Sequence, residues 1–480
     1  MQASKPKEIT AKKSENFDEW YTQVILRSEL MDYSPVSGCM VFRPLSYAIW
    51  EIIQRATDEL FKKEGIQNVY FPLLIPERLL RKEQEHVEGF APEVAWVTEA
   101  GNTKLEERLA IRPTSETIMY ESFSKWIRSY RDLPLKLNQW NSVIRWEFKH
   151  PTPFLRSREF LWNEGHTVYA TKEEAEAERD IILGIYSKIT REYLALPGII
   201  GKKTDKEKFA GAIATYSIEH LLPDGKAIQG PDFHLDGQNF SRAFEITFLN
   251  KEGKREYAWQ NTWAITTREI GVMVATHSDD RGLVLPPKVA PIQVVIIPIL
   301  DEKSKVEVLN AARDISKRLE SVARVKLDDR DYYTAGWKFN DWEIKGVPLR
   351  IEIGPRDIKA SQVILARRDT LEKFSANMKD LERAVIDTLE SIQSNLYLKA
   401  ERFLKENTRK ASNIKELKEL LEKKGGIIQV GWCGMRRCED KIKEETGGKI
   451  TNLPLQADRF EKCVICNMES KMTANVAKSY

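Results

Sequence analysis

One stretch constrains the fold and the site more than any other: residues 141–167, which read NSVIRWEFKHPTPFLRSREFLWNEGHT. It contains two β-like runs on either side of a polar, proline-containing loop. An ordinary charged hairpin is half exposed, with its charges in water. Here arginines and aromatic residues occur together. Arginine binds phosphate through two parallel hydrogen bonds, and aromatic rings stack on bases. The stretch therefore predicts a site for a ligand that carries both phosphates and a flat ring.

The length of the chain, 480 residues, is too great for one hydrophobic core and indicates about three domains. The net charge of +3 comes from 75 basic and 72 acidic residues, so it does not by itself indicate nucleic-acid binding. No run approaches the ~20 apolar residues that a membrane span needs. The lysine-rich N-terminus is followed by no apolar segment, so we expect no secretory signal and a cytoplasmic protein.

The first 285 residues predict a mostly antiparallel sheet flanked by helices, an α+β domain. Apolar spacing predicts helices at 16–30, 45–64 and 173–193. Strands are expected at 69–72, in a run ending at Arg112, and in the two arms of the hairpin. Further strands are expected at 215–221, 225–229 and 242–248, with a Gly-Pro loop between Gln229 and His234.

The pattern of expected helices and strands changes after the proline-rich run at 285–291. Beyond it, strands alternate with helices, which predicts an α/β domain with some parallel pairing. A charged helical linker at 399–424 and the pair Gly425-Gly426 are expected to mark the next boundary. The predicted division is a polar segment at 1–15 and domains at 16–285, 286–398 and 399–480.

Four of the five cysteines fall in the last domain, as Cys433 and Cys438, then Cys463 and Cys466. Two closely spaced pairs can hold one ion in a tetrahedral thiolate site. All six histidines precede residue 278, so cysteine is the locally available soft ligand. A domain this small needs more than apolar burial for stability. Four unpaired thiols are the alternative; a structural zinc site is favoured.

The candidate catalytic residues are convincing as a set. Trp162, Glu164 and His166 alternate along one strand and so share a face. Thr114 and Glu116 stand at a predicted helix start, where Thr114 or Ser115 would be the cap. Taken singly, each has a structural explanation as a cap, a loop residue or a core residue.

At this point the motifs resemble those of class II aminoacyl-tRNA synthetases, and more closely those of prolyl-tRNA synthetases of the archaeal and eukaryotic-like type. The helix and strand ending at Pro72, the stretch from IRWE to REF, and TTREIGVMVATH resemble the three class-defining motifs. The prolyl-type signatures are RPTSE, WNEGHT, GQNF, HSDDRGLVLPPKVAP and GWCG.

The resemblance implies a catalytic domain with a six-stranded antiparallel sheet, an α/β anticodon-binding domain and a small zinc-bearing α/β C-terminal domain. The first motif builds a homodimer interface in the family. The interval between Arg145 and Arg268 is too short for the editing domain of bacterial-type relatives. Tyr480 resembles the family's terminal tyrosine, whose carboxylate folds back toward the catalytic domain.

The implied activity is attachment of L-proline to tRNA(Pro) through prolyl-adenylate, with ATP, Mg²⁺ and a structural Zn²⁺. Cysteine or alanine would be activated in error. The alternatives are a class II synthetase for threonine, histidine or glycine, and an inactive relative that only binds tRNA.

The family's roles transfer by motif. The catalytic residues would be Arg145, Glu147 and Arg268. The proline site would comprise Thr114, Glu116, Arg145, Trp162, Glu164, His166, Phe209 and His234. The ATP site would comprise Arg145, Glu147, Arg156, Phe160, Gln229, Asp232, Thr266 and Arg268, although Asp232 stands where many relatives have threonine. The anticodon-reading residues would be Glu343, Arg350 and Arg356.

Overall fold

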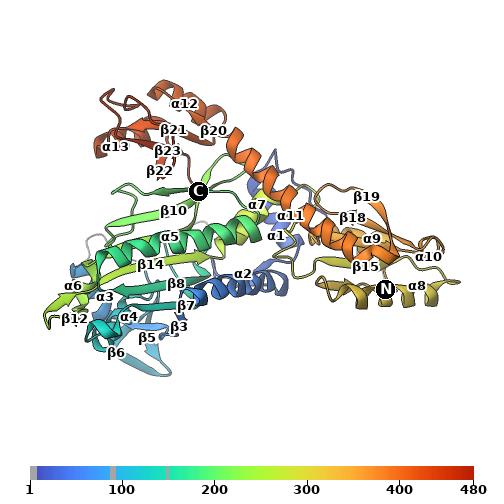
Figure 1. Ribbon diagram of the computed structural model, residues 1–480, viewed down its shortest axis with the longest axis horizontal. Helices are drawn as coiled ribbons and strands as arrows, with labels where there is room; N and C mark the ends of the chain where they lie inside the picture. The colour runs from blue at the N-terminus through green and yellow to red at the C-terminus, as the bar shows by residue number, and fades with distance from the viewer. Residues whose placement is uncertain (1–7, 87–92, 148–150) are drawn as a thin grey trace.

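The computed structural model describes residues 8–86, 93–147 and 151–480. Residues 1–7 of the predicted polar segment and 148–150 of the hairpin loop lie outside it. Three bodies are visible in Figure 1: a large sheet with its helices, a smaller α/β body beside it, and a C-terminal body above the sheet. Among the described residues, no helix is both long and apolar enough to cross a membrane.

The first body contains most of the helices and strands. Its helices are α1 (Phe17–Arg27), α2 (Pro44–Lys63), α3 (Glu77–His86), α4 (Glu116–Trp126), α5 (Lys172–Lys188), α6 (Asn239–Phe244) and α7 (Arg268–His277). Its strands are β1 (Met31–Tyr33), β2 (Met40–Phe42), β3 (Gln67–Asn68), β4 (Leu74–Pro76), β5 (Trp96–Ala100), β6 (Thr103–Ile111), β7 (Leu135–Ile144), β8 (Glu159–Tyr169), β9 (Ile199–Lys202), β10 (Ala214–Leu221), β11 (Ala227–Gly237), β12 (Thr247–Leu249), β13 (Arg255–Tyr257) and β14 (Trp259–Thr266).

The central sheet has the expected antiparallel core. Within the described chain, six strands follow one another antiparallel in the order β9-β10-β11-β14-β8-β7, and β3 joins β7 in parallel at the edge. The predicted hairpin is β7 and β8, in which Asn141 pairs with Trp162 and Val143 with Phe160. Helix α5 packs across β11 and β14.

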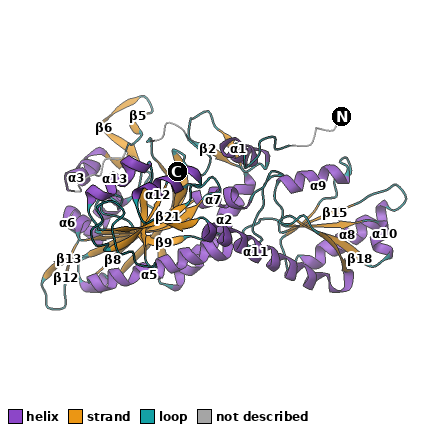
Figure 2. Ribbon diagram, turned by 90° about the horizontal axis from the view of Figure 1, so that it is seen from above, coloured by secondary structure: helices purple, strands orange, loops and turns teal. Residues whose placement is uncertain are grey.

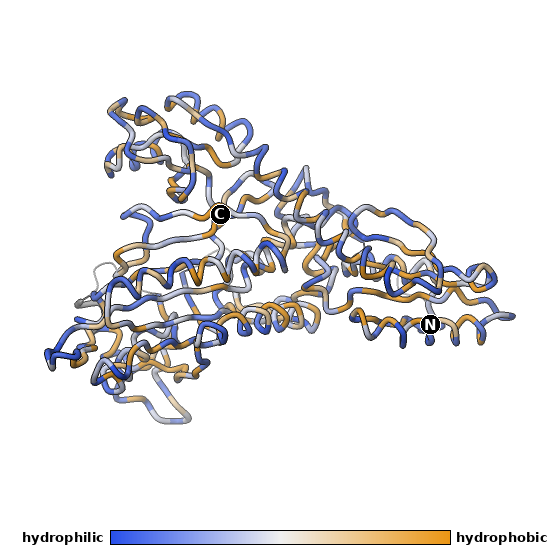
Figure 3. Tube along the Cα trace, in the orientation of Figure 1, coloured by the Kyte–Doolittle hydropathy of each residue, from blue (hydrophilic) through white to orange (hydrophobic). Residues whose placement is uncertain are grey.

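Helix α2 shows why this sheet is well supported on one side. Its buried residues include Ile49, Ile53, Thr57 and Phe61, a spacing of four that puts them on one face. The Phe61 ring lies 4.7 Å from that of Trp263 on β14, centroid to centroid. Figure 3 shows the same alternation of apolar and polar residues along the helices that flank the sheet.

Gly165, in the middle of β8, permits this packing. A Cβ at Gly165 would lie 2.1 Å from the ring of Trp263 on the neighbouring strand. A glycine is therefore required between Glu164 and His166, because the tryptophan occupies the space over its backbone.

The second body is the predicted α/β domain. It contains β15 (Val294–Pro298), α8 (Lys305–Leu319), β16 (Val325–Leu327), α9 (Ala335–Ile344), β17 (Leu349–Ile353), α10 (Pro355–Lys359), β18 (Gln362–Arg367), β19 (Lys373–Asn377) and α11 (Leu381–Glu406). Its described strands form a sheet in the order β16-β15-β17-β18-β19, in which β15 runs parallel to both of its neighbours. The predicted parallel pairing is confirmed.

The C-terminal body is joined to the central sheet by strand pairing. It contains β20 (Thr408–Lys410), α12 (Ile414–Lys423), β21 (Ile427–Trp432), α13 (Arg436–Thr446), β22 (Lys449–Pro454) and β23 (Met472–Ala477). Strand β22 pairs antiparallel with β9, so the two sheets form one continuous structure across the domains. In Figure 2, seen from above, β21 and α13 overlie the central sheet, whereas β15 and β18 of the second body lie to the right.

Three strand predictions need correction. The strand at 69–72 is replaced by two short strands, β3 and β4, on either side of it. Pro72 has no N–H to donate, and the Phe71 N–H is taken by the side chain of Gln139. The strand at 242–248 is present only at its end, in β12. Residues 242–244 belong to helix α6, where Phe240, Ala243 and Phe244 fall at helical spacing and are buried.

The third correction concerns the strand at 225–229 and the loop after it. Strand β11 runs on through Gly230 and Pro231, so Gln229 and His234 lie in one strand. The pairing with β10 slips there, where Asp232 pairs with Ser217 but Gln229 with Glu219. Gly230 and Pro231 therefore form a β-bulge, which absorbs the missing N–H of the proline.

The linker predicted at 399–424 is also wrong as a single helix. Helix α11 continues from the second body to Glu406. It is followed by β20 and α12, of which β20 pairs in parallel with β21. The stretch after Asn407 is thus part of the C-terminal body, ahead of Gly425-Gly426.

Candidate active site

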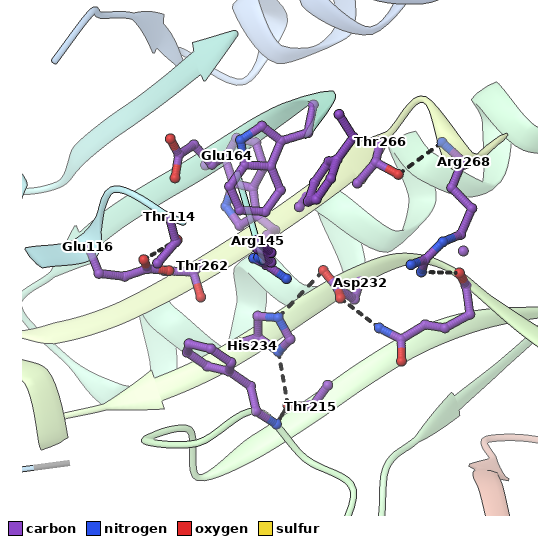
Figure 4. A pocket seen from close by; sticks show the side chains of 18 of the residues that line it. Thr114, Glu116, Arg145, Glu164, Thr215, Asp232, His234, Thr262, Thr266 and Arg268 are labelled. Atoms are coloured by element: carbon purple, nitrogen blue, oxygen red, sulfur yellow. Dashed lines mark hydrogen bonds and ion pairs between the residues drawn. The ribbon is translucent and has the colours of Figure 1, made fainter. Parts of the chain in front are cut away.

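A cavity of about 270 Å³ opens over strands β8, β11 and β14 (Figure 4). It brings together residues that lie up to 154 positions apart, from Thr114 to Arg268. Of the candidates named from the sequence in the first body, these line it: Thr114, Glu116, Arg145, Arg156, Phe160, Trp162, Glu164, His166, Phe209, Gln229, Asp232, His234, Thr266 and Arg268. Glu147 is the exception, an exposed residue in the turn after β7.

The face of β8 that carries Trp162, Glu164 and His166 points into the cavity, as their alternation predicts. Glu164 accepts hydrogen bonds from the Ser115 backbone N–H at 2.9 Å and from the Gln139 amide at 3.0 Å. Burial opposes its charge, but hydrogen bonds from His166, Ser115 and Asn141 hold the pKa of Glu164 below its ordinary value. A buried carboxylate therefore stays ionised beneath the pocket.

Arg145 lies at the end of β7 with its guanidinium over aromatic rings. The guanidinium carbon is 5.5 Å from the Phe160 ring centroid and 5.3 Å from that of Trp162. Its Nε donates to the carbonyl of Pro113 at 3.1 Å. Within the described residues it forms no salt bridge with a carboxylate. Its charge is therefore fixed in direction and available to an anionic ligand.

Arg268 begins helix α7 and is held by backbone carbonyls. Its Nη1 donates to Gln229 at 3.1 Å and its Nε to Leu155 at 3.2 Å. Burial lowers the pKa of Arg268, which remains far above neutral for a guanidinium. Arg145, which follows β7, and Arg268, which begins α7, therefore line the same cavity.

A chain of polar groups crosses the floor of the cavity on β10 and β11. The Gln229 amide donates to Asp232 at 2.8 Å, and the other Asp232 oxygen is 3.5 Å from His234 Nε2. His234 Nδ1 lies 2.9 Å from the Thr215 hydroxyl. Burial lowers the pKa of His234, so the imidazole is neutral at pH 7.

A third carboxylate, Glu116, enters the cavity from the first turn of α4. The Thr114 hydroxyl donates to it, and both side chains are buried. Ser115 is the N-cap residue but makes no side-chain cap, because its hydroxyl donates to Glu164 instead. Ser115, one of the two predicted cap residues, therefore binds a carboxylate of the pocket instead of capping the helix.

The sequence reading missed several residues of this site. Gln139 and Asn141 bind Glu164, and Thr215 and Thr262 line the cavity. The signal available for the first two was their period-two spacing on β7, opposite the strand that carries Glu164.

The anticodon candidates are only partly brought together. Glu343 and Arg350 line a second cavity of about 100 Å³ in the second body. Arg281 donates to Glu343 at 3.2 Å, and Arg350 to Glu352 at 2.8 Å. Arg356 is exposed on α10 and is not among the residues that line this cavity.

The four predicted cysteines converge at the end of β21 and the start of α13. Their Sγ atoms all lie within 4.8 Å of one another, and Cys433, Cys438 and Cys463 are buried. Four convergent thiols in this spacing fit a tetrahedral metal site, and soft thiolates suit zinc.

The C-terminus reaches the mouth of the first cavity. The Tyr480 N–H donates to the Ala227 carbonyl at 2.9 Å, and its hydroxyl bonds to Thr152 at 3.2 Å. Arg156 Nη2 lies 3.4 Å from a Tyr480 main-chain oxygen. The last residue of the chain therefore lies beside an arginine that lines the cavity.

Comparison with known protein families gives three matches along the chain. Residues 96–277 match the tRNA synthetase class II core domain (G, H, P, S and T). Residues 293–388 match the anticodon binding domain, and 414–480 match the prolyl-tRNA synthetase C-terminal family.

Full-length relatives are similar throughout. A proline–tRNA ligase of Alkaliphilus oremlandii is 52% identical, with 97% of this chain and 96% of that protein covered. A proline–tRNA ligase 2 of Bacillus cereus is 50% identical, with 98% of both covered. The crystal structure of prolyl-tRNA synthetase from Cryptosporidium parvum, complexed with halofuginone and AMPPNP, is 46% identical. It has a TM-score of 0.94 and covers 98% of this chain and 99% of its own.

Proposed function

Because this chain belongs to the prolyl-tRNA synthetase family and is a proline–tRNA ligase, we propose that the cavity over β8, β11 and β14 binds ATP and L-proline together and forms prolyl-adenylate. The observation that carries this proposal is the placement of Arg145 and Arg268 in one cavity with the buried carboxylates Glu116 and Glu164. Cationic groups suit phosphates, and carboxylates suit the amino group of proline.

In the first step the carboxylate of proline attacks the α-phosphorus of ATP, and pyrophosphate leaves. In the second, a hydroxyl of the terminal ribose of tRNA attacks the prolyl carbonyl, and AMP leaves. Neither step needs a covalent bond to the protein. The work of the side chains is to align the reactants and to offset negative charge at phosphorus.

Arg145 would bridge the α-phosphate and the carboxylate of proline. Adenine would lie between Phe160 and Arg268, with Gln229 and Thr266 beside the nucleotide and Arg156 on the phosphates. Binding of AMPPNP by the Cryptosporidium relative supports a nucleotide in this fold. Mg²⁺ bound with ATP would neutralise part of the phosphate charge. Glu147 would join only if its exposed turn bends over the bound nucleotide.

Thr114 and Glu116 would accept hydrogen bonds from the secondary ammonium of proline. Trp162, Phe209 and neutral His234 would enclose its ring, since an uncharged imidazole costs less against an apolar ring than a cation. Glu164 is already bonded by Ser115, Gln139 and Asn141, so its part would be to fix the pocket and supply negative charge. Asp232 would act through Gln229.

The remaining features extend the proposal to tRNA and assembly. We assign residues 16–285 to catalysis, 286–398 to anticodon binding and 399–480 to a zinc-bearing domain. Glu343 and Arg350 would read anticodon bases, because carboxylate and guanidinium groups match the edges of unstacked bases. Exposed apolar residues Tyr70, Leu73 and Trp126 would be covered in a homodimer, which sedimentation would detect as twice the mass of 55.5 kDa. A cytoplasmic location stays a prediction.

One experiment tests this function: proline-, threonine-, histidine- and glycine-dependent exchange of pyrophosphate into ATP. Proline alone is expected to support rapid exchange, with charging of tRNA(Pro) following. Exchange with threonine, histidine or glycine and none with proline would overturn the assignment in favour of a different class II ligase. No exchange at all would favour an inactive tRNA-binding relative.

Cysteine and alanine belong in the same panel. One methylene distinguishes ligands by only ~1–3 kcal/mol in a pocket, so slow exchange with both is expected. Absence of exchange with either, at concentrations a thousandfold above those that saturate with proline, would count against misactivation.

A further inference from the structure

One segment of the catalytic body lies between the proposed proline pocket and the C-terminal body. Residues 203–211, here called the pocket loop, connect β9 to β10. Glu207 and Phe209 on this loop line the cavity, and the Phe209 ring lies 4.8 Å from that of His234. The position of the loop therefore sets the shape of the pocket wall.

The C-terminal body holds the first half of this loop through buried polar contacts. The Thr204 hydroxyl donates to Glu439 Oε1 at 2.6 Å, and their exposed fractions are only 2% and 6%. Lys203, also buried, donates to the Thr451 carbonyl at 2.8 Å and pairs with Glu219 at 2.6 Å. The bonds from Thr204 to Glu439 and from Lys203 to the Thr451 carbonyl cross between the two bodies and would be lost if the bodies separated, whereas the Lys203–Glu219 pair lies within the first body.

Two further contacts flank the buried pair nearer the surface. Lys206 bonds to Asp440, and Lys449 lies 2.6 Å from Glu207 Oε2. These pairs are partly exposed, so each contributes less than the buried one. Thr204 and Glu439 are the members of this interface whose loss should be felt most.

Glu439 has a fixed position because it immediately follows Cys438. Both belong to the first turn of α13, and Cys438 is one of the four converging thiols. Three consecutive links thus run from the thiol cluster through Glu439 and Thr204 to Phe209 in the pocket wall.

We infer that Thr204 and Glu439 are positioning residues through which the C-terminal body sets the affinity of the pocket for its amino acid. This inference rests on the proposed function, since it takes the wall formed by Phe209 to contact proline. Neither side chain is among the residues that line the cavity. Their effect passes through the pocket loop, and the nucleotide half of the cavity is outside its reach.

Thr204→Val keeps the shape of the side chain and removes its hydroxyl. Loss of a hydrogen bond to a buried partner predicts a rise of about tenfold in the KM for proline in pyrophosphate exchange. The KM for ATP should stay within about twofold, because Arg145, Phe160 and Arg268 are untouched. Thr204→Ser restores the hydroxyl and should restore the wild-type KM.

The matched control is Lys441→Ala on α13, the helix that carries Glu439. Lys441 forms an exposed pair with Glu445, away from the pocket loop. This control should change neither KM. Glu439→Met keeps the length of the side chain, removes both acceptor oxygens and so carries the same test from the other side. Combining it with Thr204→Val should raise the KM by less than the product of the two single effects.

The outcomes separate this inference from the proposed function. Failure of the wild-type protein to exchange with proline would defeat the function itself. The inference is wrong if wild-type exchange with proline is normal but Thr204→Val has the same KM for proline as Thr204→Ser. It is equally wrong if Thr204→Val raises the KM values for proline and for ATP by the same factor. If Thr204→Val does not fold, an unchanged proline KM in folded Glu439→Met would overturn it equally.

Discussion

At the scale of single residues, the decisive group is Arg145, whose charge is oriented by rings and a carbonyl and is unpaired with any described carboxylate. Arg145→Ala should lower proline-dependent pyrophosphate exchange by about 10²-fold or more, since one aligned donor to a transition-state oxygen is commonly worth that much. The thermal unfolding midpoint should barely move, because no buried ion pair is broken.

Arg179→Ala is the matched control for this variant. Arg179 also lies over an aromatic ring, that of Tyr216, and pairs with Asp180 outside the cavity. It should leave exchange unchanged. Exchange that survives in Arg145→Ala at the level of Arg179→Ala would remove Arg145 from the mechanism.

A second residue-scale prediction concerns His277, the last residue of α7. Burial lowers the pKa of His277 to about 4, with Lys13 and Lys399 acting in the same direction. The unfolded chain, with a pKa near 6.5, then binds more protons between pH 4 and 6.5. Stability from this group is therefore complete above pH 6.5 and is lost as the pH falls toward 4.

His277→Gln removes the titration and keeps a donor for the Leu194 carbonyl, which His277 Nε2 contacts at 2.9 Å. Between pH 7 and 5 the wild type should lose about 2 kcal/mol more stability than the variant. The measurement is the unfolding midpoint at both pH values. Parallel pH profiles for the two proteins would show that His277 does not titrate as described.

Residue identities in the pocket were predictable where one strand carries them. Trp162, Glu164 and His166 share a face by alternation alone. Ser115, which also binds Glu164, comes from another segment, and nothing in its local pattern shows that it meets Glu164. The position of Gln139 opposite Glu164 follows only once the pairing of β7 with β8 is known. Glu147 is the reverse case: its motif predicts a ligand contact, but the fold leaves the residue exposed in a turn.

At the scale of elements, the thiol cluster joins the end of β21 to the start of α13 and to the loop that carries Cys463. If it holds zinc, Cys463→Ser should lower the zinc content to near zero and the unfolding midpoint by several degrees, because metal binding and folding of so small a unit are coupled. Metal analysis and a thermal scan measure both.

Cys39→Ser is the control, since Cys39 lies far along the chain from the cluster. It should retain the metal and the midpoint. A zinc-free wild-type protein with the same midpoint as Cys463→Ser would contradict a structural zinc site.

Long amphipathic elements such as α2 and α5 were predictable because their own spacing determines them. Short ones were not. The Gly-Pro pair in β11 has the local chemistry of a turn, yet pairing on both sides of it makes a bulge. The predicted strand at 242–248 overlaps the end of helix α6, because a helix of six residues is too short for periodicity to distinguish it from a strand.

At the scale of the whole molecule, the run at 285–291 lies between α7 and β15, the elements on either side of the passage from the first body to the second. The continuity of the sheet through β22 and β9 was not predictable, because it joins residues about 250 positions apart. Thr204 and Glu439 lie in contact near this strand pairing. The C-terminal body, which the sequence marks by its cysteines, therefore also contacts the loop that forms one wall of the proposed pocket.

The two cavities lie in different bodies, so a substitution in the second cavity should leave the first one intact. Arg350 lies in the second body, over the Phe339 ring at 4.3 Å and paired with Glu352. Arg350→Ala should fold, since Glu352 keeps a second partner in Lys373 at 2.7 Å. If Arg350 reads an anticodon base, the KM for tRNA(Pro) should rise roughly 10- to 100-fold, as expected from a base contact of ~1–3 kcal/mol.

Proline-dependent pyrophosphate exchange needs no tRNA, and its cavity is in another body, so its rate should be unchanged in this variant. Arg313→Ala, an exposed arginine on α8 outside the second cavity, is the control and should alter neither activity. A fall in exchange would mean that Arg350 acts on the catalytic body. A tRNA KM equal to that of Arg313→Ala would mean that the second cavity is not where the anticodon is read.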